Sequence, residues 1–275
     1  MTPSGLNCPS ECRFQECFPG VVVCDRCGLG KTVGYVNPGK LQNYECVTAI
    51  AKLERKRYFT SLFQDHFKNL GTGNALDVGC GEGLLINELR LNGWDVNGID
   101  THNFSNVTTA KDIVFGDFLE MEISEKYDLV TFVHSLEHFS QPGRVLEKVR
   151  SVLNPDGYFF IAVPNFGGTW SRTMGSNWHW LNLQDHYYHY TKCAIKKILT
   201  IHGIHIVTMT TWSAFTPSVV QMYFSEKGYF NTENLALRPA KSLLFRFSKI
   251  IRTPTNWILD QLGQGAELRI LAKLD

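Results

Sequence analysis

One stretch of the sequence, Ala75-Leu76-Asp77-Val78-Gly79-Cys80-Gly81-Glu82-Gly83, reads as a short apolar strand that runs into a glycine-rich turn. Glycine lets the backbone turn sharply and approach a ligand closely. A helix-like segment begins at Leu84, and the N-terminal amides of such a helix offer hydrogen-bond donors. The sequence therefore predicts a strand, a turn and a helix that together form one side of a ligand site.

From Gly73 onward, short strand-like runs alternate with helix-like segments. This alternation is typical of an α/β fold in which helices cover a parallel sheet. A charged and aromatic stretch before the turn also has helical spacing and is predicted to be a helix over 45–70. We expect strands at 75–78, 94–99, 113–115, 127–133, 158–163, 204–209 and 267–272, and helices at 84–91, 145–153 and 194–201.

Acidic residues follow the two strands after the turn. Asp100 ends the first of them, where a carboxylate can accept both hydroxyls of a ribose. Asp117 follows the second, where it can accept from an adenine amino group while Phe118 packs on the ring. The turn reads G-x-G-x-G after Asp77, whereas dinucleotide-binding turns read G-x-G-x-x-G, so the spacing disfavours a dehydrogenase.

Together these residues resemble the S-adenosylmethionine-dependent methyltransferases of the Rossmann-like class. The segments 127–139, 145–157 and 163–165 are similar to the branch that contains ubiquinone-pathway and sugar-modifying methyltransferases. The resemblance implies a Rossmann-like seven-stranded sheet, S-adenosylmethionine as cofactor, and methyl transfer to an oxygen, with carbon second. It assigns the cofactor to Asp77, Gly79, Gly81, Gly83, Asp100, Asp117, Phe118, Val133 and His134.

Five of the 8 cysteines lie within the first 27 residues. Cys24 and Cys27 form a C-x2-C knuckle followed by glycine, a spacing typical of zinc sites. For the other pair, the spacings of Cys8 with Cys12 and of Cys12 with Cys17 are both permissible. Pairing Cys8 with Cys12 leaves the longer connecting segment before Cys24. We therefore predict a structural zinc ion bound by Cys8, Cys12, Cys24 and Cys27. The alternative is that these cysteines are free thiols.

Many relatives in this branch carry an N-terminal zinc ribbon of CPxC and CxxCG form, and this chain resembles them apart from one extra residue in its first knuckle. The resemblance implies a small zinc ribbon over 1–40 and a methyltransferase domain over 41–275. Within the second, 212–265 is expected to be an insertion that caps the site or is structural.

His134, Glu137 and His138 follow the fourth predicted strand at i, i+3 and i+4, so on a helical turn they would face one way. They are candidates for a general base or for ligands of a divalent metal. The ubiquinone O-methyltransferases, which the chain resembles, have a carboxylate where His134 stands. An equally weighted alternative is that Glu137 and His138 cap a helix and bond the backbone.

A dense aromatic and histidine segment follows at 178–190. Aromatic walls with a few polar groups describe a small-molecule pocket, and the segment resembles the branch's W…H-x-x-H-(F/Y) stretch. We expect the acceptor to bind here, with His186 as the leading base and His189 second. The alternative is a packed lid whose histidines bond main-chain carbonyls.

The charge of the chain gives no reason to expect a nucleic-acid partner, because 27 basic residues stand against 26 acidic ones. Val133-His134-Ser135 also departs from the tetrapeptides of DNA-base methyltransferases. We expect a cytoplasmic enzyme and a small-molecule acceptor, with a sugar or glycan precursor ahead of a quinone or lipid. The basic amphipathic segment 243–252 either packs on its own domain or lies on a membrane surface. A non-catalytic protein that binds S-adenosylmethionine or acts as a scaffold is the remaining alternative.

Overall fold

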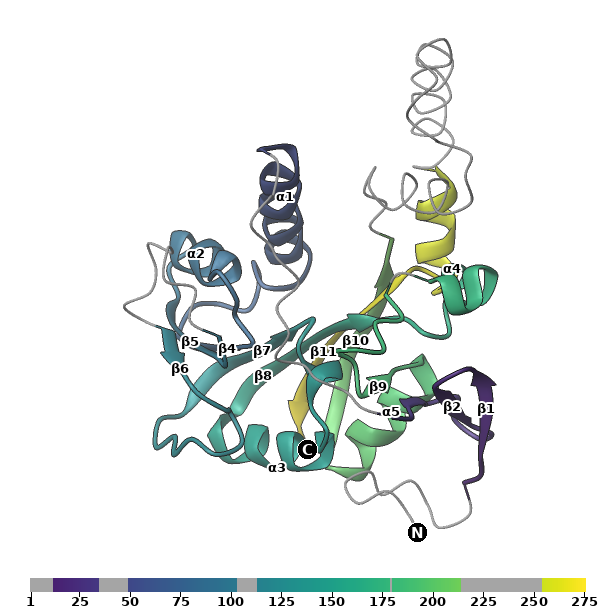
Figure 1. Cartoon of the computed structure of the whole chain (residues 1–275). Coiled ribbons are helices and arrows are strands. Elements are labelled where there is room, and N and C mark those ends of the chain that lie inside the picture. The colour runs from purple at the N-terminus through teal and green to yellow at the C-terminus, as the bar shows by residue number, and fades with distance from the viewer. Residues whose placement is uncertain (1–11, 35–48, 103–112, 179, 214–253) are drawn as a thin grey trace.

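The computed structural model describes residues 12–34, 49–102, 113–178, 180–213 and 254–275 (Figure 1). Two of the features expected from the sequence, Cys8 and the basic segment 243–252, lie outside these residues, as does most of the expected insertion. The described residues form two sheets with helices packed around the larger one.

The larger sheet contains seven strands, which confirms the expected Rossmann-like α/β fold. They are β4 (Asn74–Val78), β5 (Asp95–Asp100), β6 (Ile113–Phe115), β7 (Tyr127–Val133), β8 (Leu153–Pro164), β10 (Ile204–Trp212) and β11 (Glu267–Leu274). Their order across the sheet is β10-β11-β8-β7-β4-β5-β6. Strands β4 to β8 pair in parallel, whereas β11 runs antiparallel to both β8 and β10.

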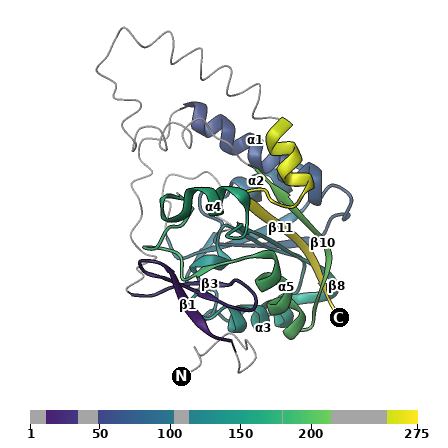
Figure 2. The ribbon, with the colours of Figure 1, turned by 90° about the vertical axis from the view of Figure 1, so that its right-hand side faces the viewer.

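Helices cover both faces of this sheet (Figures 1 and 2). α1 (Ala49–His66) and α2 (Leu84–Leu91) pack on one face, where their apolar side chains join those of β4, β5 and β7 in a buried cluster. α3 (Pro142–Val152) and α5 (Lys192–Ile201) pack on the other. α3 starts with proline, which is favourable in the first turn of a helix, and buries apolar residues at helical spacing, including Val145 and Val149.

The smaller sheet joins the N-terminal segment to a distant part of the chain. Its strands are β1 (Phe14–Phe18), β2 (Val21–Cys24), β3 (Gly30–Thr32) and β9 (Tyr188–His189), in that order and all antiparallel. Gly30 pairs with His189, and a Cβ atom at Gly30 would lie 2.9 Å from the His189 Cβ atom. Glycine therefore permits the close approach of β3 to β9.

Shorter helices complete the described structure. They are η3 (Leu136–His138), α4 (Thr169–Met174), η4 (Gly175–Asn177) and a helix over 254–261. Among the described residues, none of the helices combines the length and the apolar character that a membrane span requires.

The strand order places the candidate functional residues at one edge of the larger sheet. β4 lies between β5 and β7, and the chain leaves β4 toward one side and reaches β7 on the other. Ligands of open α/β sheets bind outside the carboxyl ends of the strands at such a reversal of order. The site is therefore expected after β4, β5 and β7.

Candidate functional site

A pocket of about 980 Å³ lies at this carboxyl edge. Its walls come from the residues after β4, β5, β6 and β7, from η3, and from the segment 180–187. The pocket contains predicted cofactor residues at one end and predicted acceptor-side residues at the other. Those that line it are Gly79, Asp100, Asp117, Phe118, His134, Glu137, His138 and His186.

The glycine-rich turn lies close to the residue that follows β7. Gly79 has a φ of 74° and a Cβ atom there would lie 2.4 Å from the Ser135 Cβ atom, so this position requires glycine. The Ser135 hydroxyl donates to the Val78 carbonyl (2.6 Å), which fixes the two segments together. The turn is thus held against the start of η3.

Asp77 lies beneath the turn and does not line the pocket. It is 3% exposed and accepts a hydrogen bond from the Thr131 hydroxyl (2.6 Å). Burial raises the pKa of Asp77 to about 7, which the hydrogen bond from Thr131 opposes. Asp77 therefore supports the turn from beneath, whereas the sequence analysis predicted that it would contact the cofactor.

Asp100 is held in a fixed orientation at the end of β5. The backbone amide of Gly81 donates to its Oδ2 atom and that of His102 to its Oδ1 atom, both at 2.8 Å. Each carboxylate oxygen retains a lone pair for a further donor. Gly81 thus orients Asp100 through its backbone amide, and Gly83, with a φ of 71°, is the N-cap residue that precedes α2.

Asp117, Phe118 and Val133 differ in their access to the pocket. Asp117 is exposed and lines the pocket, while its Oδ1 atom accepts the Leu119 amide (2.8 Å). Phe118 is 1% exposed and packs edge-on against Phe132, with ring centroids 5.6 Å apart. Val133 packs in the cluster under α1 and α2 and is not among the lining residues.

His134 lines the pocket in a left-handed backbone conformation, with a φ of 53°. Its Nε2 atom lies 2.8 Å from Oε2 of Glu267, and its Nδ1 atom lies 3.6 Å from Oε1 of Glu137. Burial lowers the pKa of His134, but Glu267 and Glu137 more than offset this and raise it to about 10. At neutral pH the ring is therefore an imidazolium between two carboxylates.

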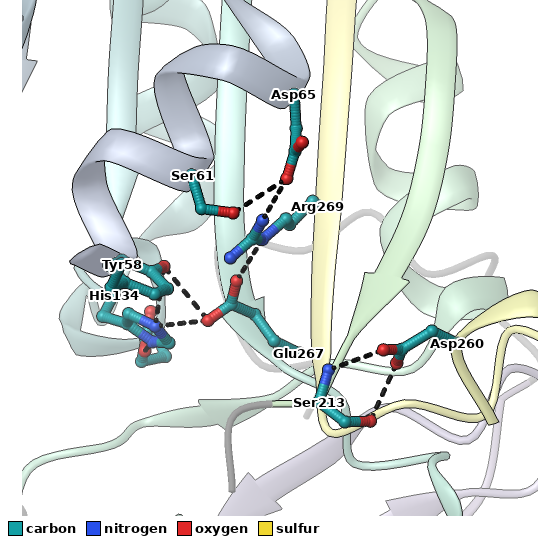
Figure 3. A network of polar contacts seen from close by, with 9 residues as sticks. Tyr58, Ser61, Asp65, His134, Ser213, Asp260, Glu267 and Arg269 are labelled. Carbon is teal, nitrogen blue, oxygen red and sulfur yellow. Dashed lines mark hydrogen bonds and ion pairs between the residues drawn. The ribbon is translucent and has the colours of Figure 1, made fainter. Parts of the chain in front are cut away.

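Residues that the sequence did not single out complete this charged group (Figure 3). The Tyr58 hydroxyl of α1 donates to Glu267 (3.1 Å), and Arg269 donates to the same carboxylate through Nε (2.6 Å). The Arg269 guanidinium lies 4.3 Å from the centroid of the Trp212 ring. The group connects α1, the end of β7 and β11. The available sequence signal was that two charged residues, Glu267 and Arg269, stand at the start of the largely apolar strand β11.

Glu137, His138 and His186 meet at the acceptor end of the pocket. One possible ligand atom from each lies within 4.8 Å of the other two. Glu137 is 1% exposed and His186 is 8% exposed. Burial raises the pKa of Glu137, but the neighbouring histidines, His134 foremost, lower it to about 2. Burial lowers the pKa of His186 to about 4, so this ring is neutral at pH 7.

His189 is close to the pocket but not part of its wall. It is 3% exposed, and its Nε2 atom lies 3.0 Å from the hydroxyl of Thr32 in β3. Burial lowers the pKa of His189 to about 4. Of the two histidines that the sequence analysis singled out as bases after β8, His186 lines the cavity and His189 does not.

Three of the four predicted zinc ligands, Cys12, Cys24 and Cys27, come together beside the smaller sheet. Cys24 and Cys27 are buried and Cys12 is half-buried, whereas Cys17 is exposed. Burial raises the pKa of the Cys24 thiol, but the backbone amides of Cys27 and Arg26 and the thiols of Cys27 and Cys12 lower it to about 7. Thiolate formation near neutral pH is what a metal-binding knuckle requires.

Comparison with known proteins gives a family and several relatives. The sequence model of a family described as a methyltransferase domain matches residues 43–208. The chain is 30% identical over 112 residues to the ubiquinone biosynthesis O-methyltransferase of Paraburkholderia phytofirmans, which covers 37% of this chain and 48% of that protein. It is 32% identical over 114 residues to the enzyme of the same name from Marinobacter nauticus, with the same coverage. The chain thus spans about half the length of the curated relatives it matches.

Solved structures share the fold at low sequence identity. An S-adenosylmethionine-dependent methyltransferase from Archaeoglobus fulgidus has a TM-score of 0.51 at 17% identity, covering 82% of this chain and all of that one. The magnesium protoporphyrin IX methyltransferase from Synechocystis, solved with S-adenosylhomocysteine, also has a TM-score of 0.51, at 14% identity, covering 84% of this chain and 89% of that one. These likenesses support the seven-stranded fold.

Proposed function

Because this chain belongs to the methyltransferase domain family, we propose that it transfers a methyl group from S-adenosylmethionine to an oxygen of a small molecule. The observation that carries the proposal is that Asp100 and Glu137 line one continuous cavity. A cofactor held at the first residue and an acceptor held at the second would lie in the same cavity. Methyl transfer needs such alignment of the two reactants.

The cofactor half of the pocket supports binding of S-adenosylmethionine. Asp100 presents a fixed carboxylate with lone pairs available for the two ribose hydroxyls. Asp117 is exposed at the same end and can accept from the adenine amino group. Gly79 lets the backbone approach the ligand, and Gly81 keeps Asp100 in place.

Transfer to a hydroxyl releases a proton, and the acceptor half of the pocket contains groups that can receive it. The neutral ring of His186 faces the cavity, and its Nδ1 atom has no hydrogen-bond partner among the described residues. We propose His186 as the proton acceptor, with Glu137 and His138 orienting the hydroxyl. His134 is already protonated at neutral pH, so its role is to fix the charge of Glu137.

A sugar or glycan precursor is the leading acceptor in this proposal. Polar side chains line the pocket beside His186, among them Asn182 and Asp185, and they suit a ligand with several hydroxyls. A quinone precursor is the second candidate, because the names of the curated relatives include ubiquinone biosynthesis. Membrane contact by the segment 243–252 would accompany this second candidate.

We also propose that Cys8, Cys12, Cys24 and Cys27 bind a structural zinc ion. The convergence of Cys12, Cys24 and Cys27, and the lowered pKa of Cys24, support this part of the proposal. Metal analysis of the purified protein should find one zinc ion per chain. Cys24→Ser should remove it, whereas a matched change at the exposed Cys193 should not.

Methyl-labelled S-adenosylmethionine tests the activity. The protein is incubated with the labelled cofactor and a small-molecule and membrane extract of its host, and the label is then partitioned between phases. Label in aqueous small molecules supports the sugar precursor, and label in the organic phase supports the quinone or lipid. His186→Ala should abolish transfer, with the exposed His205→Ala as its control. An absence of any transferred label, with cofactor binding retained, would indicate the non-catalytic alternative.

A further inference from the structure

We infer that Thr32 is a positioning residue for His186 and acts through the main chain of the segment that carries this histidine. The inference rests on the proposed function, because it concerns the histidine proposed there as the proton acceptor. Thr32 belongs to the smaller sheet and is not among the residues that line the pocket. Any effect it has on transfer must therefore pass through the segment 186–189.

Three hydrogen bonds connect Thr32 to this segment. Its hydroxyl donates to the His186 carbonyl (2.7 Å). The Nε2 atom of His189 lies 3.0 Å from the same hydroxyl oxygen and donates to it, because the hydroxyl has already used its only proton. The Thr32 amide donates to the Tyr187 carbonyl (3.1 Å). One residue thus fixes three of the four positions from 186 to 189.

The segment depends on such bonds because it contains little regular structure. His186 lies in neither a helix nor a strand, and β9, which follows, is two residues long. On the side of the pocket, the His186 amide donates to the Asn182 carbonyl (2.8 Å) and the Tyr187 amide to the Glu137 carbonyl (2.9 Å). Together with Thr32, these bonds set the position of the His186 backbone, and hence of its ring, relative to η3.

The strand that carries Thr32 is itself held firmly. Thr32 is opposite Val21 of β2, and the two residues are 7% and 0% exposed. Two positions earlier, Gly30 lies so close to His189 that a Cβ atom would come within 2.9 Å of the His189 Cβ atom. Loss of the hydroxyl would leave the buried N–H group of His189 without its acceptor, and such a group is costly to leave unpaired. We therefore expect the segment to move, whereas β3 stays in place.

Thr191 provides a matched comparison because it connects the same two parts of the chain. Its hydroxyl donates to the Cys27 carbonyl (2.6 Å) and accepts the Ala194 amide (3.1 Å) at the start of α5. Loss of this hydroxyl removes an N-cap and one contact with the N-terminal segment, so it should lower stability. The bonds that Thr32 makes to 186–189 would remain.

The ring of His186 gives a readout that a merely stabilising role of Thr32 would not change. Burial lowers the pKa of His186 to about 4. The titratable groups that face the ring are Glu137, which raises this pKa, and His138, His189 and His134, which lower it. A displaced ring would gain contact with solvent, and its pKa would rise toward 6.5, the ordinary value for histidine.

The first experiment follows the histidine rings of the full chain by nuclear magnetic resonance, with isotope-labelled histidine, over the pH range in which the protein stays folded. The signal missing from His186→Ala identifies His186. In Thr32→Val we expect its pKa to rise, whereas Thr32→Ser and Thr191→Val should keep the value of the parent protein. An unchanged pKa in Thr32→Val, or an equal rise in Thr191→Val, overturns the inference.

The second experiment measures transfer and cofactor binding on the same proteins. Thr32→Val should lower the transfer of label from methyl-labelled S-adenosylmethionine to the host extract by about tenfold or more, because small displacements of reacting groups are costly. Thr32→Ser should restore transfer. The affinity for S-adenosylhomocysteine should stay unchanged and shows which variants are folded; Thr32→Ala takes the place of the valine variant if that one does not bind.

The two experiments separate this inference from the proposed function. Full transfer by a folded Thr32→Val variant overturns the inference and leaves the methyltransferase proposal standing. An absence of transferred label with the parent protein overturns the proposed function and with it the catalytic consequence. In that case a raised pKa of His186 in Thr32→Val would still locate the failure in the proposed reaction and not in the contact with Thr32.

Discussion

Thr32 and His189 share a hydrogen bond of 3.0 Å between Oγ1 and Nε2, although they lie 157 positions apart in the chain. The Thr32 hydroxyl donates its proton to the His186 carbonyl (2.7 Å), so His189 must be the donor in the first bond. One buried hydroxyl of the smaller sheet thus fixes both histidines that the sequence singled out after β8.

This pair predicts that Thr32→Val destabilises the protein by about 1–3 kcal/mol, because valine leaves the buried N–H group of His189 without an acceptor. Thr32→Ser keeps the hydroxyl and should recover most of the loss. Urea unfolding of the three proteins measures the difference. Equal stabilities for the valine and serine variants would show that the hydroxyl does not bond as described.

Because Arg269 and Glu267 form a buried ion pair, we expect that removing one partner will greatly lower the free energy of unfolding. Both side chains are at most 1% exposed, and Arg269→Met would remove one of the two cations beside Glu267. The expected destabilisation is about 3–5 kcal/mol, as for other broken buried pairs.

A double-mutant cycle provides the control for this second prediction. Glu267→Gln together with Arg269→Met should cost less than the sum of the two single changes, since the uncompensated charge is gone. If the two single changes and the double change have strictly additive effects on the free energy of unfolding, measured in urea, Arg269 and Glu267 are not coupled.

The half-buried histidine His66 should make the protein less stable as the pH falls below neutral. Burial lowers its pKa from 6.5 to about 4, with a further lowering by Arg269, and its ring packs on Phe160 with centroids 5.0 Å apart. Between pH 6.5 and 4 the unfolded chain therefore binds the proton more readily than the folded one. The neutral His66 ring therefore contributes fully to the free energy of unfolding above pH 6.5, and this contribution is lost as the pH falls from 6.5 to 4.

His66→Phe should make the free energy of unfolding fall less steeply between pH 6.5 and 4. Denaturant unfolding at several pH values measures the slope, and the exposed His205→Phe provides the comparison. The same slope in His66→Phe as in the parent protein would be evidence that the ring titrates normally.

Because Asp100 is proposed to bind the ribose, we expect that replacing it will selectively lower the affinity for the cofactor. Asp100→Asn keeps one oxygen but removes the charge, so the dissociation constant for S-adenosylhomocysteine should rise about tenfold or more if two ribose hydroxyls bind there. Asp95→Asn, at the exposed start of the same strand, should have no effect. Calorimetry decides between these outcomes, and unchanged affinity in Asp100→Asn would remove this residue from the cofactor site.

The features predicted well from the sequence are those that depend on local pattern. The turn at Gly79, the carboxylate at Asp100 and the alternation of strands with helices each follow from residues close together in the chain. Because the carboxyl ends of parallel strands meet at one edge, these local features also predicted the position of the pocket.

The features that were missed depend on long-range contacts. β9 is two residues long and pairs with a strand near the N-terminus, so no periodicity indicated it. The charge of His134 depends on Glu267, which lies 133 positions away, and no spacing rule connects them. A histidine identified as a candidate base is therefore a fixed cation, because its pKa is set by a partner that the sequence does not place beside it.

The pairing of β3 with β9 also bears on how this protein can be divided experimentally. A cut after residue 40 would remove β1, β2 and β3, three strands of the four-stranded sheet, and leave β9 behind without them. Unpaired edges of this kind favour association between molecules. The N-terminal residues and the catalytic part should therefore be expressed as a single unit, and a shortened chain that aggregates or loses acceptor turnover would reflect the exposed edge at His189 and its neighbours.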